Sequence, residues 1–140
     1  MRISIVALIA VSVLVGVGVA SKVRGSETPN VSVLGGLVYD AGRTPAGHPL
    51  THVYRLNNPH SFPVGLSIVT TGCECTTAQA SAAVIPAHGK ADVTLRVKLE
   101  DTNNISAGAC FATTHGGQRV ETWLLLTGQI DRGAIRAEVR

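Results

Sequence analysis

The sequence predicts an all-β protein, an antiparallel immunoglobulin-like sandwich of about seven strands preceded by an apolar N-terminal helix. Two observations indicate this class, and a third indicates the composition of its core. Runs of roughly five to ten strand-forming residues alternate with turn signals along the chain. Outside the N-terminal segment, no stretch has the apolar spacing of an amphipathic helix. Only 4% of the residues are aromatic, so Val, Leu, Ile and Ala must supply most of the core.

The N-terminal segment is predicted to be a signal peptide or a signal anchor, that is, a transmembrane helix that holds the protein in a membrane. Residues 3–20 carry no charge and are almost entirely apolar, and Arg2 gives the segment a positive start. Gly18 and Ala20 are small residues that suit cleavage before Ser21. The length of the apolar run instead suits a retained span. We expect an exported chain, and the sequence leaves open whether the segment is cleaved.

The remainder of the chain is predicted to form a single domain. Residues 21–30 are polar and contain glycine and proline, which is typical of a short linker. Residues 31–140 have the size of one sandwich domain, and the chain contains no internal repeat.

The strand assignments rest on alternation of apolar and polar residues. Strands are expected at residues 31–39, 50–58, 63–71, 90–99, 106–114 and 118–130. The clearest alternation is in residues 90–99, which are typical of a half-buried antiparallel strand. Residues 42–49 contain two prolines and two glycines and are assigned to a loop. Gly116 and Gly117 predict a short hairpin between the last two strands.

Charge and motifs exclude several classes of function. The net charge is +3, but the basic residues are scattered singly, so we expect no nucleic-acid partner. The chain has no G-x-S-x-G motif and no glycine-rich loop leading into a helix. His60 and Ser61 are adjacent but have no orienting acid nearby. We therefore expect a protein that is not an enzyme and carries no cofactor.

Three cysteines are the chemically distinctive residues. Cys73 and Cys75 occur in the stretch T-G-C-E-C-T, and on an extended chain residues two apart face the same side. A disulfide between them closes a very small ring, so the favoured pairing joins Cys110 to either Cys73 or Cys75 and leaves one thiol over. Glu74 is expected to raise the pKa of its neighbouring thiols.

A metal site is the alternative interpretation of the cysteines. Two thiolates on one face suit Cu(I) or Zn(II). Further ligands would come from four residues, namely Cys110, His52, His60 and His115. A hydrogen-bonded core role is favoured for His52, which shares an apolar strand face with Tyr54. Trp123 is expected in the core of the sandwich.

The chain resembles a known family in four stretches that occur in the same order. They are L-x-H-x-Y-x-L-x-N at residues 50–58, Pro63-Val64, T-G-C-E-C-T at residues 71–76, and the turn at residues 85–90 with the alternating strand after it. These are similar to motifs of the family called domain of unknown function 1573, small exported bacterial proteins related to Hydin-like and sperm-protein-like immunoglobulin folds. The resemblance implies a sandwich in the periplasm or cell envelope, with residues 3–20 in the inner membrane if they are retained. It implies no established activity.

These observations favour a non-catalytic interaction or scaffold module outside the cytoplasm. Its partner would be a protein, and addition of a partner strand to a sheet edge is the natural mode of binding. The alternative is a soft-metal or thiol-redox protein that uses Cys73 and Cys75. The partner, the pathway and the oligomeric state are not fixed by the sequence.

Overall fold

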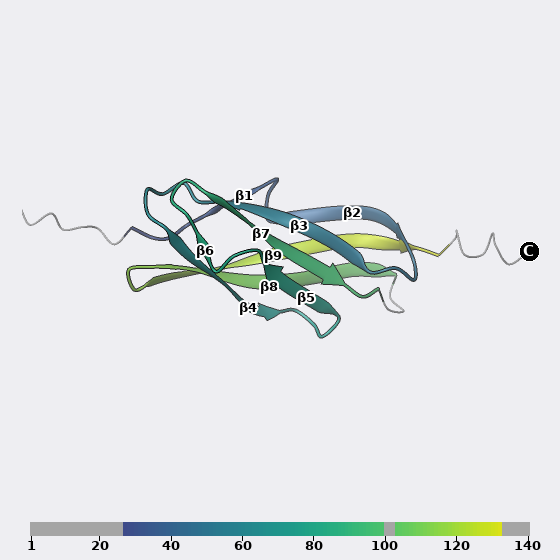
Figure 1. Ribbon diagram of the computed structural model, residues 1–140. Coiled ribbons are helices and arrows are strands. Elements are labelled where there is room, and N and C mark those ends of the chain that lie inside the picture. The colour runs from purple at the N-terminus through teal and green to yellow at the C-terminus, as the bar shows by residue number, and fades with distance from the viewer. Residues whose placement is uncertain (1–26, 100–102, 133–140) are drawn as a thin grey trace, which may run out of the picture.

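The computed structural model describes residues 27–99 and 103–132, so the predicted apolar segment at residues 3–20 and most of the predicted linker lie outside it. The described part is an elongated sandwich of two β-sheets (Figure 1). No helix in residues 27–99 and 103–132 has the length and apolar character needed to cross a membrane. The all-β immunoglobulin-like prediction is confirmed.

The two sheets contain four and five strands. The four-stranded sheet has the order β1 (Ser32–Leu34), β3 (Leu50–Asn57), β7 (Lys90–Val97) and β5 (Thr76–Ala80). The five-stranded sheet has the order β2 (Val38–Pro45), β9 (Gln118–Asp131), β8 (Asn104–His115), β4 (Val64–Thr71) and β6 (Val84–Ile85). All pairings are antiparallel except that of β2 with β9.

The alternation in β7 sets the core. Ala91, Val93, Leu95 and Val97 are buried, and the residues between them face outward. Tyr54 and Leu56 of β3 face the same interior, where they meet Phe111 and Leu124 from the opposite sheet. The face predicted for residues 50–58 is therefore confirmed, with Tyr54 donating a hydrogen bond across the core to the backbone oxygen of Leu125.

The first predicted strand is divided between the two sheets. Gly35 and Gly36 have positive φ angles of 87° and 93°, which only glycine adopts readily, and they turn the chain from β1 into β2. The loop predicted at residues 42–49 is wrong for residues 42–45, because β2 continues to Pro45 alongside β9. A bulge between Asp40 and Arg43 absorbs the irregular residues there.

The sequence pattern predicts the last hairpin correctly but does not predict the two shortest strands of the second half of the chain. Gly116 and Gly117 have φ angles of 55° and 80° and join β8 to β9, as predicted. Strands β5 and β6 were not predicted. They have only five and two residues, and neither shows a clear alternation of apolar and polar side chains.

One end of the sandwich is fixed by Asn58, which is fully buried. Its Nδ2 donates to the backbone oxygens of Phe62, Ile85 and Pro86, and its Oδ1 accepts from the backbone of His60. This side chain therefore joins the β3–β4 loop to the start of the β6–β7 loop. The loop between β4 and β5, which contains Cys73 and Cys75, lies at the opposite end of β4.

Candidate functional site: an apolar sheet face and a cysteine loop

The outer face of the five-stranded sheet carries a group of exposed apolar side chains. Trp123 and Leu125 of β9 are 48% and 42% exposed, and Val38 of β2 is 55% exposed. Val38 lies opposite Leu125 in the pairing of β2 with β9. We call these three residues the apolar face.

The position of Trp123 corrects the prediction that it lies in the core. Leu124 and Leu126 are completely buried, so strand alternation turns Trp123 and Leu125 outward. The stretch from Trp123 to Leu126 is apolar throughout, and such a run does not reveal from the sequence which residues face inward.

A glycine in the neighbouring strand gives the apolar face its shape. Gly108 of β8 lies opposite Leu125. A Cβ atom at Gly108 would lie 3.2 Å from Leu125 Cδ2 and 3.5 Å from Trp123 Cε3. The two large side chains therefore lie close over the glycine, which leaves them room against the sheet.

Cys110 lies in the same outer layer, opposite Trp123 in β9 and Thr70 in β4. It is a free cysteine and only 1% exposed. Burial raises the pKa of its thiol, and the carboxylate of Glu121 raises that pKa further. Cys110 is therefore a protonated, enclosed thiol at neutral pH.

Polar residues border the apolar face at both ends of β9. Arg119 and Glu121 form an exposed ion pair with an N–O distance of 3.0 Å. At the other end, Asp40, Arg43 and Gln129 contribute to a polar hollow of about 410 Å³. An apolar patch with a charged border is the usual composition of a protein-binding surface.

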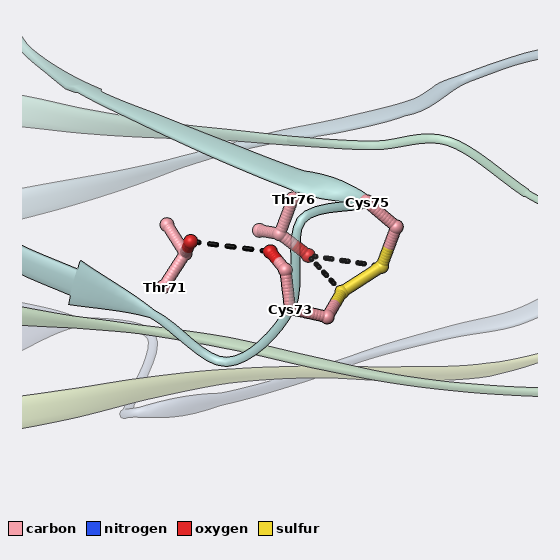
Figure 2. The surroundings of a disulfide bond; sticks show 4 residues. All are labelled: Thr71, Cys73, Cys75 and Thr76. Atoms are coloured by element: carbon pink, nitrogen blue, oxygen red, sulfur yellow. Dashed lines mark hydrogen bonds between the residues drawn. A yellow bond between two sulfur atoms is a disulfide. The ribbon is translucent and has the colours of Figure 1, made fainter.

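The cysteine loop joins β4 to β5, and its disulfide connects Cys73 to Cys75 (Figure 2). The predicted pairing with Cys110 is therefore not the one in the structure. The register of β4 with β8 explains the difference, because it places Cys110 opposite Thr70, before the loop begins. The extra thiol that the sequence led us to expect is Cys110.

Thr76 places a hydroxyl beside both sulfurs of the disulfide. Its side chain is almost fully buried, and its Oγ1 lies 3.3 Å from Cys73 Sγ and 3.6 Å from Cys75 Sγ (Figure 2). The hydroxyl of Thr71 instead donates to the backbone oxygen of Cys73. The sequence showed the motif, but the contact of Thr76 with both sulfurs depends on the turn between Cys73 and Thr76.

The structure does not bring the proposed metal ligands together. Within the described residues, no three His, Cys, Asp or Glu side chains form a group that could hold a metal ion. His52 faces the interior, stacked on Tyr39 with ring centroids 3.6 Å apart, and its burial lowers its pKa. His60 and His115 stack on either side of Phe62 at the end remote from the cysteine loop.

Comparison with protein families identifies the chain. The model described as "Protein of unknown function (DUF1573)" matches residues 35–110. The chain belongs to this family, and the resemblance seen in the sequence is confirmed. No curated protein matches the sequence.

Solved structures with low sequence identity share the fold. A Porphyromonas gingivalis W83 protein of unknown function is 16% identical with a TM-score of 0.59, and the match covers 73% of this chain and 47% of that one. The human CEP192 ASH/PapD-like domain 7 is 12% identical with a TM-score of 0.58, covering 74% and 87%. The Vibrio cholerae VesB protease is 9% identical with a TM-score of 0.58, covering 71% and 31%. The chain thus spans about half of the first of these proteins and a third of the last.

Proposed function

We propose that this member of the DUF1573 family is a non-catalytic module that works outside the cytoplasm and binds a protein partner through the apolar face. The observation that carries the proposal is the exposure of Trp123 beside Leu125 and Val38. These three side chains add nothing to the core between the sheets, so the fold does not require them to be apolar. A partner that covered them would gain about 1 kcal/mol or more from each.

The composition of the apolar face indicates the chemistry of the partner. Trp is one of the residue types most enriched among those that dominate the energy of a protein interface, where near-neutral contacts surround them. Here the border contains Arg119 and Glu121, charges of both signs. The matching surface is an aliphatic or aromatic patch on another protein, bordered by charges that can pair with these two.

The edge strand next to the apolar face is poorly suited to pairing with a partner strand. Binding through the side chains of the apolar face is therefore favoured on this side of the molecule. Strand β2 is the edge next to the apolar face, and its bulge, its charged Asp40 and Arg43, and its final Pro45 all oppose pairing with another strand. Strands β1 and β6 have only three and two residues. Strand β5 is the edge at which the predicted addition of a partner strand can still occur.

The proposed location and the absence of catalysis rest on other features. Residues 3–20 support export to the periplasm or cell envelope, with an inner-membrane anchor if they are retained. His60, the one histidine next to a serine, is held by the backbone oxygen of Asn30 and the ring of Phe62. The likeness to a protease at 9% identity concerns the fold alone.

Photo-crosslinking in the cells that make the protein tests the proposal. A photoreactive amino acid at Leu125 is compared with one at Val53, which is similarly exposed on the outer face of the other sheet. We expect position 125 to yield a crosslinked product with one defined protein, identified by mass spectrometry, and position 53 to yield none. Equal products from both positions, or a product with the mass of two copies of this chain, would refute the proposed partner.

A further inference from the structure

The cysteine loop contains a disulfide that contributes little to holding the fold together. One residue separates Cys73 from Cys75, so the bond closes a very short stretch of chain. A disulfide stabilises mainly by restricting the unfolded chain, and this effect shrinks as the closed loop becomes shorter. Both cysteines are partly buried, and Cys75 packs against the core residues around Val97.

The hydroxyl of Thr76 lies where it can bind either sulfur, and it binds a thiolate more strongly than a disulfide sulfur. Neither disulfide sulfur carries a proton, so in these two contacts the hydroxyl is the donor. A hydrogen bond from a hydroxyl to a neutral sulfur is weak, whereas one to a thiolate is charge-assisted and much stronger. The hydroxyl therefore stabilises whichever sulfur becomes a thiolate, and a stabilised leaving thiolate speeds thiol–disulfide exchange.

The backbone holds the loop in place independently of the disulfide. The amide of Gly72 donates to the oxygen of Gly108 at 2.8 Å, and the amide of Lys98 donates to the oxygen of Cys75 at 2.9 Å. The amide of Thr76 also closes a turn onto the oxygen of Cys73 at 3.2 Å. Because β7 and β8 fix both sides of the loop, we expect the two cysteines to remain adjacent after reduction.

We propose that Cys73 and Cys75 form a thiol–disulfide exchange site whose substrate is a dithiol. A substrate thiolate attacks one sulfur, a mixed disulfide forms, and the other sulfur leaves as a thiolate beside the Thr76 hydroxyl. The second substrate thiol then loses its proton and attacks the mixed disulfide. The substrate departs as a disulfide after giving up two electrons, and Cys73 and Cys75 take up two protons and become thiols.

Some charged side chains around the cysteine loop disfavour a thiolate there, and others favour it. The exposed carboxylate of Glu74, between the two cysteines, disfavours a thiolate. Arg96 and Lys98 line a hollow of about 290 Å³, and the backbone amide of Lys98 donates to Cys75, so the positive charges of these two side chains favour a thiolate. Cys110 takes no part, since it lies buried beside Trp123 on the outer sheet face.

Reduction of the native protein by dithiothreitol, a model dithiol, tests the proposal. The full chain carries Cys110→Ala, so Cys73 and Cys75 are its only cysteines. Samples are quenched in acid, alkylated and weighed as intact protein, with circular dichroism recorded in parallel. We expect two thiols to appear while the spectrum of the folded protein is retained.

Three variants separate the hydroxyl contact from a general effect on the loop. Thr76→Val removes the hydroxyl and should slow reduction about tenfold, the worth of one hydrogen bond to a charged group. Thr76→Ser keeps the hydroxyl and should restore the rate. Thr71→Val removes a hydroxyl that contacts only the backbone of Cys73, and should change the rate by less than about twofold.

Two results would overturn the proposal. One is reduction that occurs only as fast as the chain unfolds, which would make the disulfide a protected structural bond. The other is equal rates for Thr76→Val and Thr71→Val. If Thr76→Val does not fold, the comparison of Thr76→Ser with Thr76→Ala decides, and equal rates for these two would contradict the role of the hydroxyl.

Discussion

The outer faces of the two sheets differ although both face solvent. On the four-stranded sheet, Val53 lies opposite Thr94, and Leu34 lies opposite Arg55. Arg55 also forms an ion pair with Asp92 at 3.1 Å. On the five-stranded sheet, Val38 and Leu125 lie directly opposite each other, and Trp123 shares the space over Gly108 with Leu125.

This difference shows which apolar side chains the fold requires. An antiparallel sheet needs only its inner face to be apolar, and the four-stranded sheet largely follows that pattern. The adjoining side chains of the apolar face add nothing to the core between the sheets. We therefore attribute them to binding, and the following changes test that attribution, beginning with the largest expected effect.

Neighbouring leucines in β9 should respond very differently to truncation. Leu124→Ala removes a completely buried side chain and should lower the free energy of unfolding by about 2–5 kcal/mol. Leu125→Ala should lower it by less than about 1 kcal/mol, because that side chain already faces solvent. Urea denaturation measures both values. Similar losses for the two variants would mean that the apolar face is part of the structural core.

Placing a carboxylate on one outer face and then on the other shows which sheet the partner contacts. Leu125→Asp should weaken binding of the crosslinked partner at least about tenfold, because it places a carboxylate in the centre of the contact. Val53→Asp should leave the affinity within about twofold. Titration of the partner with each variant gives the affinities, and equal weakening would place the contact elsewhere.

A methyl group at Gly108 should displace the side chains of the apolar face from the sheet side. The added methyl of Gly108→Ala would lie 3.1 Å from the backbone oxygen of Leu124 and 3.2 Å from Leu125 Cδ2. We expect a loss of about 1–2 kcal/mol in unfolding free energy and a change in Trp123 fluorescence. An unchanged spectrum would show that Trp123 does not rest over this position.

Alkaline pH should weaken the fold through two buried acids. Burial raises the pKa of the Cys110 thiol, and burial followed by the charge of Tyr39 raises that of Tyr54 to about 12. Both groups lose their protons more easily in the unfolded chain, so stability should be full below pH 9 and fall as the pH rises towards 12. Cys110→Ala should reduce the slope of unfolding free energy against pH. An identical slope would contradict the burial of that thiol.

Much of the fold follows from local pattern, and much of the candidate site does not. The alternation in β7 determines which of its residues face the core, and the paired glycines determine the β8–β9 turn. Both features depend only on local sequence, and both predictions are confirmed. Trp123 lies in an unbroken apolar run, so only the packing of Leu124 against the opposite sheet determines which way it faces.

The pairing of the cysteines also depends on tertiary structure, here on how β4 aligns with β8. The sequence shows three cysteines but not that β4 and β8 align Cys110 with Thr70. The same alignment leaves Cys73 and Cys75 in the loop after β4, where each is the nearest cysteine to the other. Thr76 was visible only as part of the motif, because its contact with the sulfurs exists only once the loop has turned.

Fluorescence of the protein during titration with the crosslinked partner tests the central claim most directly. The chain contains a single tryptophan, so its emission reports on the apolar face alone. We expect binding to shift the emission of Trp123 to shorter wavelength as the partner removes the indole from water. A partner that binds with the emission unchanged would contact another surface, and the proposed role of the apolar face would be wrong.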